Sequence, residues 1–226
     1  MALQTTNSPA LAEEVLFVSA YFKQGTAAQQ PAVGAVQNID QDREIFAESD
    51  RAEHFYKVVS GVVRTCKFLM DGRRQIEGFH VAGDIFGFEP GSQHLLTAEA
   101  VTDCTVIAYR KQKMDLYAGG DELLSRDLLA FAVRGMAKAQ HHSLLLGRRS
   151  AMEKVAGFLL DWAQGSANRR VVSLAMTRQD IADYLNLTIE TVSRTLSQLE
   201  RDNVIALPSA RQIGLKNLDA LEDLAA

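Results

Sequence analysis

The chain has 226 residues, of which 47% are hydrophobic and 23% are charged, and its net charge is -4. This length and composition suit two ordinary globular domains and exclude a largely disordered chain. The sequence has no run of 18 apolar residues, and no basic segment followed by an apolar core at its start. We therefore expect a cytoplasmic protein with no membrane partner.

The negative net charge argues against a nucleic-acid partner, but the distribution of charge does not. Residues 147–216 carry ten Lys and Arg against seven Asp and Glu, whereas acidic residues are in excess before them. Contact with phosphates requires local positive charge. The sequence therefore predicts any nucleic-acid-binding part in its C-terminal third.

The N-terminal half is interpreted as an arm followed by a compact β domain. Residues 1–30 combine a polar stretch with one short helical pattern. Over residues 31–118, short apolar runs alternate with turn signals: Gly61, Gly72 and Gly83 recur at intervals of 11 residues, and Asp71-Gly72 is typical of a hairpin turn. Regular spacing of this kind predicts a small antiparallel β-roll.

Two cysteines, Cys66 and Cys104, lie in predicted strands of this roll. They form no CxxC pair and have no neighbouring metal-ligand pattern, so we interpret them as buried, reduced thiols and expect no metal site. Redox chemistry at these thiols is the alternative that the sequence leaves open.

Residues 119–147 show a long helical pattern with two apolar faces. One face could pack on the roll, and the second is most simply buried against a copy of itself in a dimer. The alternative is a helix that lies entirely within the core of one subunit. Residues 147–150 then resemble a hinge. The proposed dimer stripe consists of Leu129, Ala132, Met136, Ala139, Ser143 and Leu146.

Residues 148–226 contain the most informative segment of the chain. Thr177 and Asp180 have the spacing of a capping box, which predicts a helix over residues 178–185. Asn186 and Leu187 form a turn, and Thr188 caps a second helix over residues 189–201. Two short strands around residues 208–211 follow as a wing, and an acidic amphipathic helix ends the chain. This is helix-turn-helix spacing.

Apolar residues of the second helix turn inward, which leaves its first turns for the major groove of duplex DNA. Arg194 can bond guanine O6 and N7, Glu190 can accept from cytosine N4, and Ser193 can adapt to several base edges. The candidate base contacts are Ile189, Glu190, Ser193 and Arg194. The candidate phosphate contacts are Thr177, Arg178, Gln179, Thr188, Thr191 and Arg211.

The order of roll, long helix and winged helix-turn-helix resembles the CRP/FNR superfamily over about residues 30–217. Within IETVSRTL, Glu190, Ser193 and Arg194 match the E-x-x-S-R pattern of its FNR side, and the chain is most similar to the FixK-like group. The resemblance implies an α+β fold with a cyclic-nucleotide-binding-like β-roll, a dimerisation helix and a DNA-binding domain. It also implies a homodimer on a two-fold TTGAT...ATCAA type site, an activator role under oxygen limitation and contact with RNA polymerase.

Two departures from the family restrict what the resemblance implies. Two thiols cannot ligate a four-cysteine iron-sulfur cluster. His94-Leu95 stands where the cyclic-AMP receptor has an Arg-Ser couple for the cyclic phosphate, and an apolar Leu beside a mostly neutral His makes a poor anion site. We expect no cofactor and no cyclic nucleotide.

A metal-dependent β-roll enzyme is the alternative class of protein. Metal-dependent β-roll enzymes need several convergent ligands, whereas His54, His80 and His94 stand alone and His141-His142 lies on the long helix. We therefore expect no enzymatic activity. A regulator gated by heme or another small ligand, with His80 or His94 as axial ligand, remains the alternative.

Overall fold

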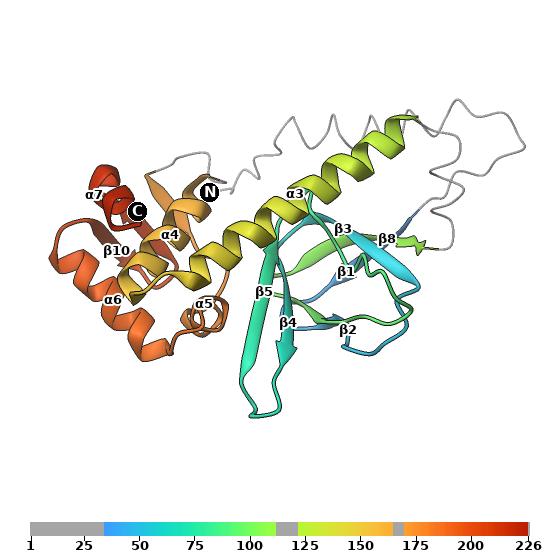
Figure 1. Ribbon diagram of the computed structural model, residues 1–226, viewed down its shortest axis with the longest axis horizontal. Helices are drawn as coiled ribbons and strands as arrows, with labels where there is room; N and C mark the ends of the chain where they lie inside the picture. Colours follow the sequence, from blue (N-terminus) through green and yellow to red (C-terminus); the bar gives the residue numbers. More distant parts are fainter. Residues whose placement is uncertain (1–33, 112–121, 165–169, 226) are drawn as a thin grey trace, which may run out of the picture.

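The computed structural model describes residues 34–111, 122–164 and 170–225, with residues 122–128 described as backbone only. The predicted N-terminal arm therefore lies outside the described residues, and so does the change from strand to helix before α3. The long helix α3 (Glu122–Gly147) runs along the β-roll, and its C-terminal end reaches the C-terminal unit (Figure 1). The predicted order of roll, long helix and helix-turn-helix is confirmed.

The roll consists of two four-stranded antiparallel sheets, with strand orders β1-β8-β3-β6 and β2-β7-β4-β5. Phe46, Val58, Val63 and Val106 are buried between them, because alternate residues of each strand point inward. The strands are β1 (Ala35–Ile39), β2 (Glu44–Phe46), β3 (His54–Ser60), β4 (Val63–Phe68), β5 (Arg74–His80), β6 (Ile85–Phe86), β7 (Thr97–Ala100) and β8 (Cys104–Arg110).

The glycines predicted to punctuate the roll do lie between strands. Gly61 separates β3 from β4, Gly72 lies in the hairpin between β4 and β5, and Gly83 precedes β6; all three have positive φ. L-residues with a Cβ disfavour this conformation, so glycine is needed at these turns.

The long helix ends at the predicted hinge. After α3, Ser150 begins α4 (Ala151–Gln164) by accepting a hydrogen bond from the backbone N of Glu153 at 3.1 Å. Leu145 near the end of α3 is buried against the C-terminal unit, together with Phe158 and Leu159 of α4. The hinge is therefore a packed junction between helices.

The C-terminal unit surrounds one apolar core that includes Ile181, Leu185, Leu196 and Leu221. Its elements are β9 (Val171–Ser173), α5 (Arg178–Leu185), α6 (Ile189–Arg201), β10 (Ile205–Ser209), β11 (Gln212–Leu215) and α7 (Leu218–Ala225), and the sheet order is β10-β11-β9. Both predicted helices of the helix-turn-helix are confirmed, with starts at Arg178 and Ile189 as expected.

The wing differs in one detail from the expectation of a four-residue turn over residues 208–211. Pro208 and Ser209 belong to β10, and only residues 210–211 form the turn. The reason is that β10 is an edge strand with an irregularity between Ala206 and Ser209. An edge strand tolerates a proline because its backbone N need not donate to a neighbour.

Two glycines at similar positive φ provide a matched test of the roll. A Cβ on Gly61 would lie 2.7 Å from Cys104 Sγ and collide with the carbonyl oxygen of Asp103, whereas a Cβ on Gly72 would meet nothing within 4 Å. We expect Gly72→Ala to lower the free energy of unfolding by about 1–2 kcal/mol through its φ alone. Gly61→Ala adds a steric cost of about 1–3 kcal/mol. Urea denaturation of both variants checks this; equal losses would contradict the collision.

Candidate nucleic-acid interface

The helix-turn-helix is fixed locally by two caps and a turn. Thr177 and Asp180 form the predicted capping box, in which the hydroxyl of Thr177 accepts from Asp180 N and the Asp180 carboxylate accepts from Thr177 N. Asn186 ends α5 in the left-handed conformation with φ 52°, which asparagine tolerates better than most residues. The backbone N of Leu187 donates to Ala182 O at 2.9 Å, which closes the turn.

The second helix presents its polar face to solvent. Thr188 caps α6 by accepting from Thr191 N at 3.2 Å. Val192, Leu196 and Leu199 are buried, as predicted from their spacing. The four candidate base contacts Ile189, Glu190, Ser193 and Arg194 are all exposed.

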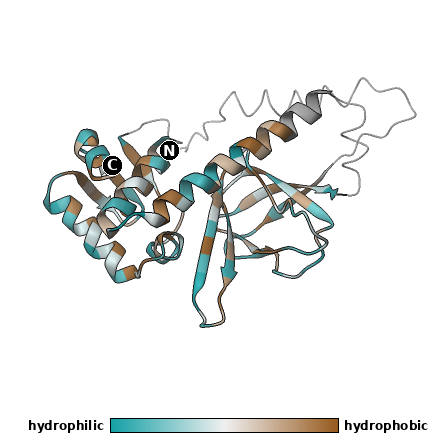
Figure 2. Cartoon of the chain, viewed as in Figure 1, coloured by the Kyte–Doolittle hydropathy of each residue, from teal (hydrophilic) through white to brown (hydrophobic). Residues whose placement is uncertain are grey.

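The exposed turn combines a cation, an anion and a hydroxyl. Hydrogen bonds from its own backbone N and from Thr188 hold the pKa of Glu190 below its usual range, so this carboxylate accepts hydrogen bonds at neutral pH. Figure 2 shows hydrophilic and hydrophobic residues alternating along α6, as expected of a helix with one buried and one exposed face. A face with donors and acceptors but few apolar groups suits polar base edges.

The candidate phosphate contacts differ in how free their side chains are. Thr177 donates to Asp180 Oδ2 at 2.7 Å and Gln179 donates to Asp183 Oδ1 at 2.7 Å, so both are engaged within the protein. Thr188, which caps α6, shares a hydrogen bond with Thr191. Arg178, whose pKa is lowered by burial, is half-buried, and Arg211 is exposed at the turn between β10 and β11.

The exposed face of α3 is rotated slightly from the predicted stripe. Leu129, Ala132, Met136, Ala139 and Ser143 are exposed as a dimer seam requires, whereas Leu146 is half-buried. Sequence reasoning missed Val133 and Leu144, which are among the most exposed large apolar side chains of the described residues. Their positions place the centre of the apolar face opposite His142 and Leu145, which are buried.

Sequence reasoning also missed two arginines of the roll. Arg64 on β4 and Arg74 on β5 form ion pairs with Asp180 of α5, and Arg74 also pairs with Asp183. Strand residues with charged side chains usually face water, so no local pattern identifies them as partners of a helix more than 100 residues away in sequence. The helix-turn-helix is thereby attached to the roll.

The thiols of the roll are placed unfavourably for redox chemistry. Cys66 and Cys104 are both buried, and burial raises the pKa of the Cys66 thiol to about 11. The thiolate is the reactive form, so this environment does not support a redox role at neutral pH. Among the described residues, no group of three or more His, Cys, Asp and Glu side chains is arranged to hold a metal ion.

The two histidines considered as axial ligands have close neighbours. His94 is buried and stacks on Phe46 with ring centroids 3.6 Å apart, and burial lowers its pKa. His80 lies 3.0 Å from Thr65 Oγ1 and stacks on Phe86. Burial also lowers the pKa of His80, so both rings are neutral at pH 7.

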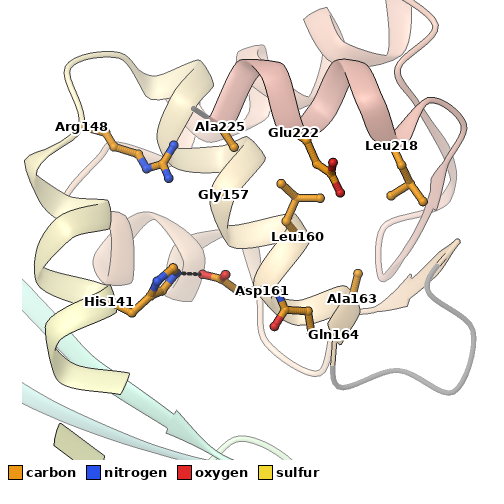
Figure 3. A pocket seen from close by; sticks show the side chains of 10 residues that line it. All are labelled: His141, Arg148, Gly157, Leu160, Asp161, Ala163, Gln164, Leu218, Glu222 and Ala225. Carbon is orange, nitrogen blue, oxygen red and sulfur yellow. Dashed lines mark hydrogen bonds and ion pairs between the residues drawn. The ribbon is translucent and has the colours of Figure 1, made fainter. Parts of the chain in front are cut away.

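A cavity of about 350 Å³ lies where α3, α4 and α7 meet (Figure 3). Its wall carries Arg148, Asp161 and Glu222, and His141 bonds Asp161 at 2.7 Å. Charges of both signs therefore offset one another within it, and this cavity does not have the character of an anion site.

Among the residues described, no helix is long and apolar enough to cross a membrane.

Two family models match the chain. A cyclic nucleotide-binding domain matches residues 36–117, and a Crp-like helix-turn-helix domain matches residues 153–224. The first match covers the roll and the second covers the helix-turn-helix with its wing.

Individual relatives agree with these matches over most of the chain. A nitrogen fixation regulation protein FixK of Azorhizobium caulinodans is 46% identical over 85% of this chain and 80% of its own length. The fumarate and nitrate reduction regulatory protein of Escherichia coli is 30% identical over 83% and 77%. The solved structure of FixK2 from Bradyrhizobium japonicum is 44% identical, covers 86% of this chain and 98% of its own, and superposes with a TM-score of 0.80. The chain belongs to the CRP/FNR family of DNA-binding transcription regulators.

Proposed function

We propose that this regulator binds DNA as a homodimer, reads base edges with the first turns of α6, and is competent without a small-molecule effector. The observation that carries the proposal is the exposed turn with Glu190, Ser193 and Arg194, on a helix whose opposite face is buried. A helix presented in this way can enter a major groove without rearranging its own core.

Each side chain of this turn has a distinct role. The guanidinium of Arg194 donates two hydrogen bonds to O6 and N7 of a guanine, and the ionised carboxylate of Glu190 accepts from a cytosine amino group. Ser193 adjusts to either a donor or an acceptor, and Ile189 makes apolar contact. The proposed target has the two-fold form TTGAT...ATCAA.

Phosphate contacts orient the helix without reading sequence. Arg178 at the first position of α5 and Arg211 on the wing supply positive charge, and Thr188 and Thr191 supply hydroxyls at the mouth of α6. Thr177 and Gln179 lie beside them, although their side chains are engaged with Asp180 and Asp183. We assign Gln179 a phosphate contact through its backbone N, which lies in the first turn of α5. The backbone N of Thr177 donates to Asp180 Oδ2, so we propose that Thr177 supports the phosphate site by capping α5.

The dimer is proposed to form along α3. A monomer would leave Leu129, Val133, Met136 and Leu144 exposed to water along one face. A second copy of the same helix buries such a face symmetrically, and it places two recognition helices on one DNA duplex.

Independence from cyclic nucleotide is supported by the surroundings of His94 and of Asp84, the acid of the Gly83-Asp84 pair that begins the segment compared above with the cyclic-AMP receptor. Both carboxylate oxygens of Asp84 accept from Lys138 of α3 at 2.8 Å, so this acid is already paired within the protein. His94, with its lowered pKa, offers no cation to a cyclic phosphate. Lys138 instead attaches the long helix to the roll.

The names of the relatives suggest the physiological setting. The relatives are named as regulators of nitrogen fixation and of fumarate and nitrate reduction. We propose that this chain activates genes needed when oxygen is limiting, and that surface loops contact RNA polymerase.

Selection of bound sequences from a random duplex pool, without any added effector, tests the proposed target. We expect the wild-type protein to enrich a two-fold site with half-sites TTGAT and ATCAA. Arg194→Ala should enrich the same site with relaxed preference at the guanine, because a bidentate contact contributes about 1–3 kcal/mol of discrimination. Enrichment of no common sequence by the wild type would contradict the function.

Arg178→Ala is the matched control, because it removes a cation from the same surface without removing a base contact. Gel-shift titrations at several salt concentrations should show weaker binding to every sequence and a shallower dependence of affinity on salt. If the two variants lose specific and non-specific binding equally, the division of roles is wrong.

Met136→Glu tests the dimer seam. Two carboxylates placed face to face in an apolar seam repel each other and lose hydration, so we expect the dimer to dissociate at concentrations where the wild type is dimeric. Sedimentation velocity measures the change, and DNA affinity should fall with it. Met136→Leu keeps the seam apolar and should remain dimeric; an unaltered dimer for Met136→Glu would place the interface elsewhere.

A further inference from the structure

The roll and the helix-turn-helix meet where β5 lies beside α5 (Figure 1). Aromatic side chains from both parts pack at this interface. The ring of Phe79 of β5 packs edge-on against Trp162 of α4, with ring centroids 5.9 Å apart, and against Tyr184 of α5, with ring centroids 5.3 Å apart. His142 of α3 stacks on Tyr184 at 3.9 Å. Apolar contact of this kind holds two parts together but specifies their angle only loosely.

An ion-pair network lies beside the aromatic residues. Arg74 donates to Asp183 Oδ2 at 2.8 Å and also bonds Asp180 Oδ1. Arg64 donates to the same oxygen of Asp180 at 3.2 Å and to Glu99 Oε2 at 2.7 Å. Two guanidinium groups of the roll thus converge on one carboxylate of α5.

The two oxygens of that carboxylate have separate tasks. Asp180 Oδ2 accepts from the backbone N and the hydroxyl of Thr177, at 2.9 and 2.7 Å, and so begins α5. Asp180 Oδ1 receives the two arginines. The side chain is only 2% exposed, so water cannot replace either set of partners while the interface is closed.

The charges of this network are retained at neutral pH. Burial acts to raise the pKa of Asp180, but the hydrogen bonds from Thr177 and the charges of Arg64 and Arg74 outweigh it and hold the pKa below its usual value. A rotation of α5 away from β5 would therefore leave an ionised carboxylate without its cations.

We propose that Arg64 and Arg74 are positioning residues for DNA recognition. They hold the helix-turn-helix on the roll in the orientation that exposes the first turns of α6, called here the reading turn. This inference rests on the proposed function, because it concerns how that reading turn is presented. In this orientation Glu190, Ser193 and Arg194 are exposed while α5 packs on β5. The network takes the place of an effector by fixing the competent arrangement in the free protein.

The chain contains an intrinsic probe of this docking. Trp162 is its single tryptophan, and it packs against Phe79 of the roll. We expect Arg64→Gln and Arg74→Gln to shift its emission to longer wavelength below the melting temperature, because an open interface exposes the indole to water. Binding to a duplex with the TTGAT and ATCAA half-sites should weaken by about 5- to 150-fold, the usual range of coupling between distant parts.

Lys67→Gln is the matched control. Lys67 also lies on β4 and forms a 2.7 Å ion pair, but with Glu48 of the same roll and at its surface. It should change neither emission nor affinity. Arg74→Lys keeps the charge without the fork that bridges two carboxylates, so its affinity should lie between those of the wild type and Arg74→Gln.

A double-mutant cycle shows whether Arg74 acts through Asp183. If it does, Arg74→Gln combined with Asp183→Asn binds DNA no more weakly than the weaker single variant. Unshifted emission in Arg74→Gln, or a shift with unchanged DNA affinity, would overturn the proposal. A shift in a protein whose wild type binds no DNA would instead overturn the proposed function and leave the docking intact.

Discussion

The carboxylate of Asp180 joins the two halves of the molecule. It begins the first helix of the helix-turn-helix through Thr177 and receives two guanidinium groups from the roll. A buried anion without hydrogen-bond donors destabilises the folded state. The start of α5 is therefore fixed relative to β4 and β5, which carry the two arginines. The left-handed Asn186 then sets the direction of α6 from α5. The place of the recognition helix therefore follows from an interaction at the start of the preceding helix, α5.

The long helix α3 complements this attachment through its separate faces. Lys138 holds it to the roll through Asp84, and His142 donates to the carbonyl oxygen of Tyr184 at 2.9 Å. The remaining face, with Met136 near its centre, is exposed and apolar. Because α3 is attached to the roll on one face and to α5 on another, the direction of its exposed apolar face is fixed relative to both. The proposed dimer and the proposed reading turn are thus related through one rigid element.

Local signals explain how much of this could be predicted from the sequence. The bounds of α5 and α6 follow from caps at Thr177 and Thr188 and from regular apolar spacing, and the turns of the roll follow from glycines with positive φ. Arg64 and Arg74 could not be predicted, because a partner more than 100 residues away leaves no mark on a strand. Val133 and Leu144 were missed for a related reason: an apolar stripe on a helix can be drawn in adjacent registers, and only packing on the roll decides which one faces out.

A buried ion-pair network is a poor way to gain stability, since desolvation offsets most of the attraction and apolar side chains of similar size often do as well. It is a better way to gain specificity of orientation, because hydrogen-bond geometry tolerates far less rotation than apolar contact does. Reading DNA with two copies of α6 imposes that demand: in the proposed dimer the two helices must be about 34 Å apart to meet successive major grooves. Aromatic contacts such as that of Phe79 with Trp162 hold the roll and the C-terminal unit together. The two ion pairs at one oxygen of Asp180 fix the orientation of α5 relative to the roll.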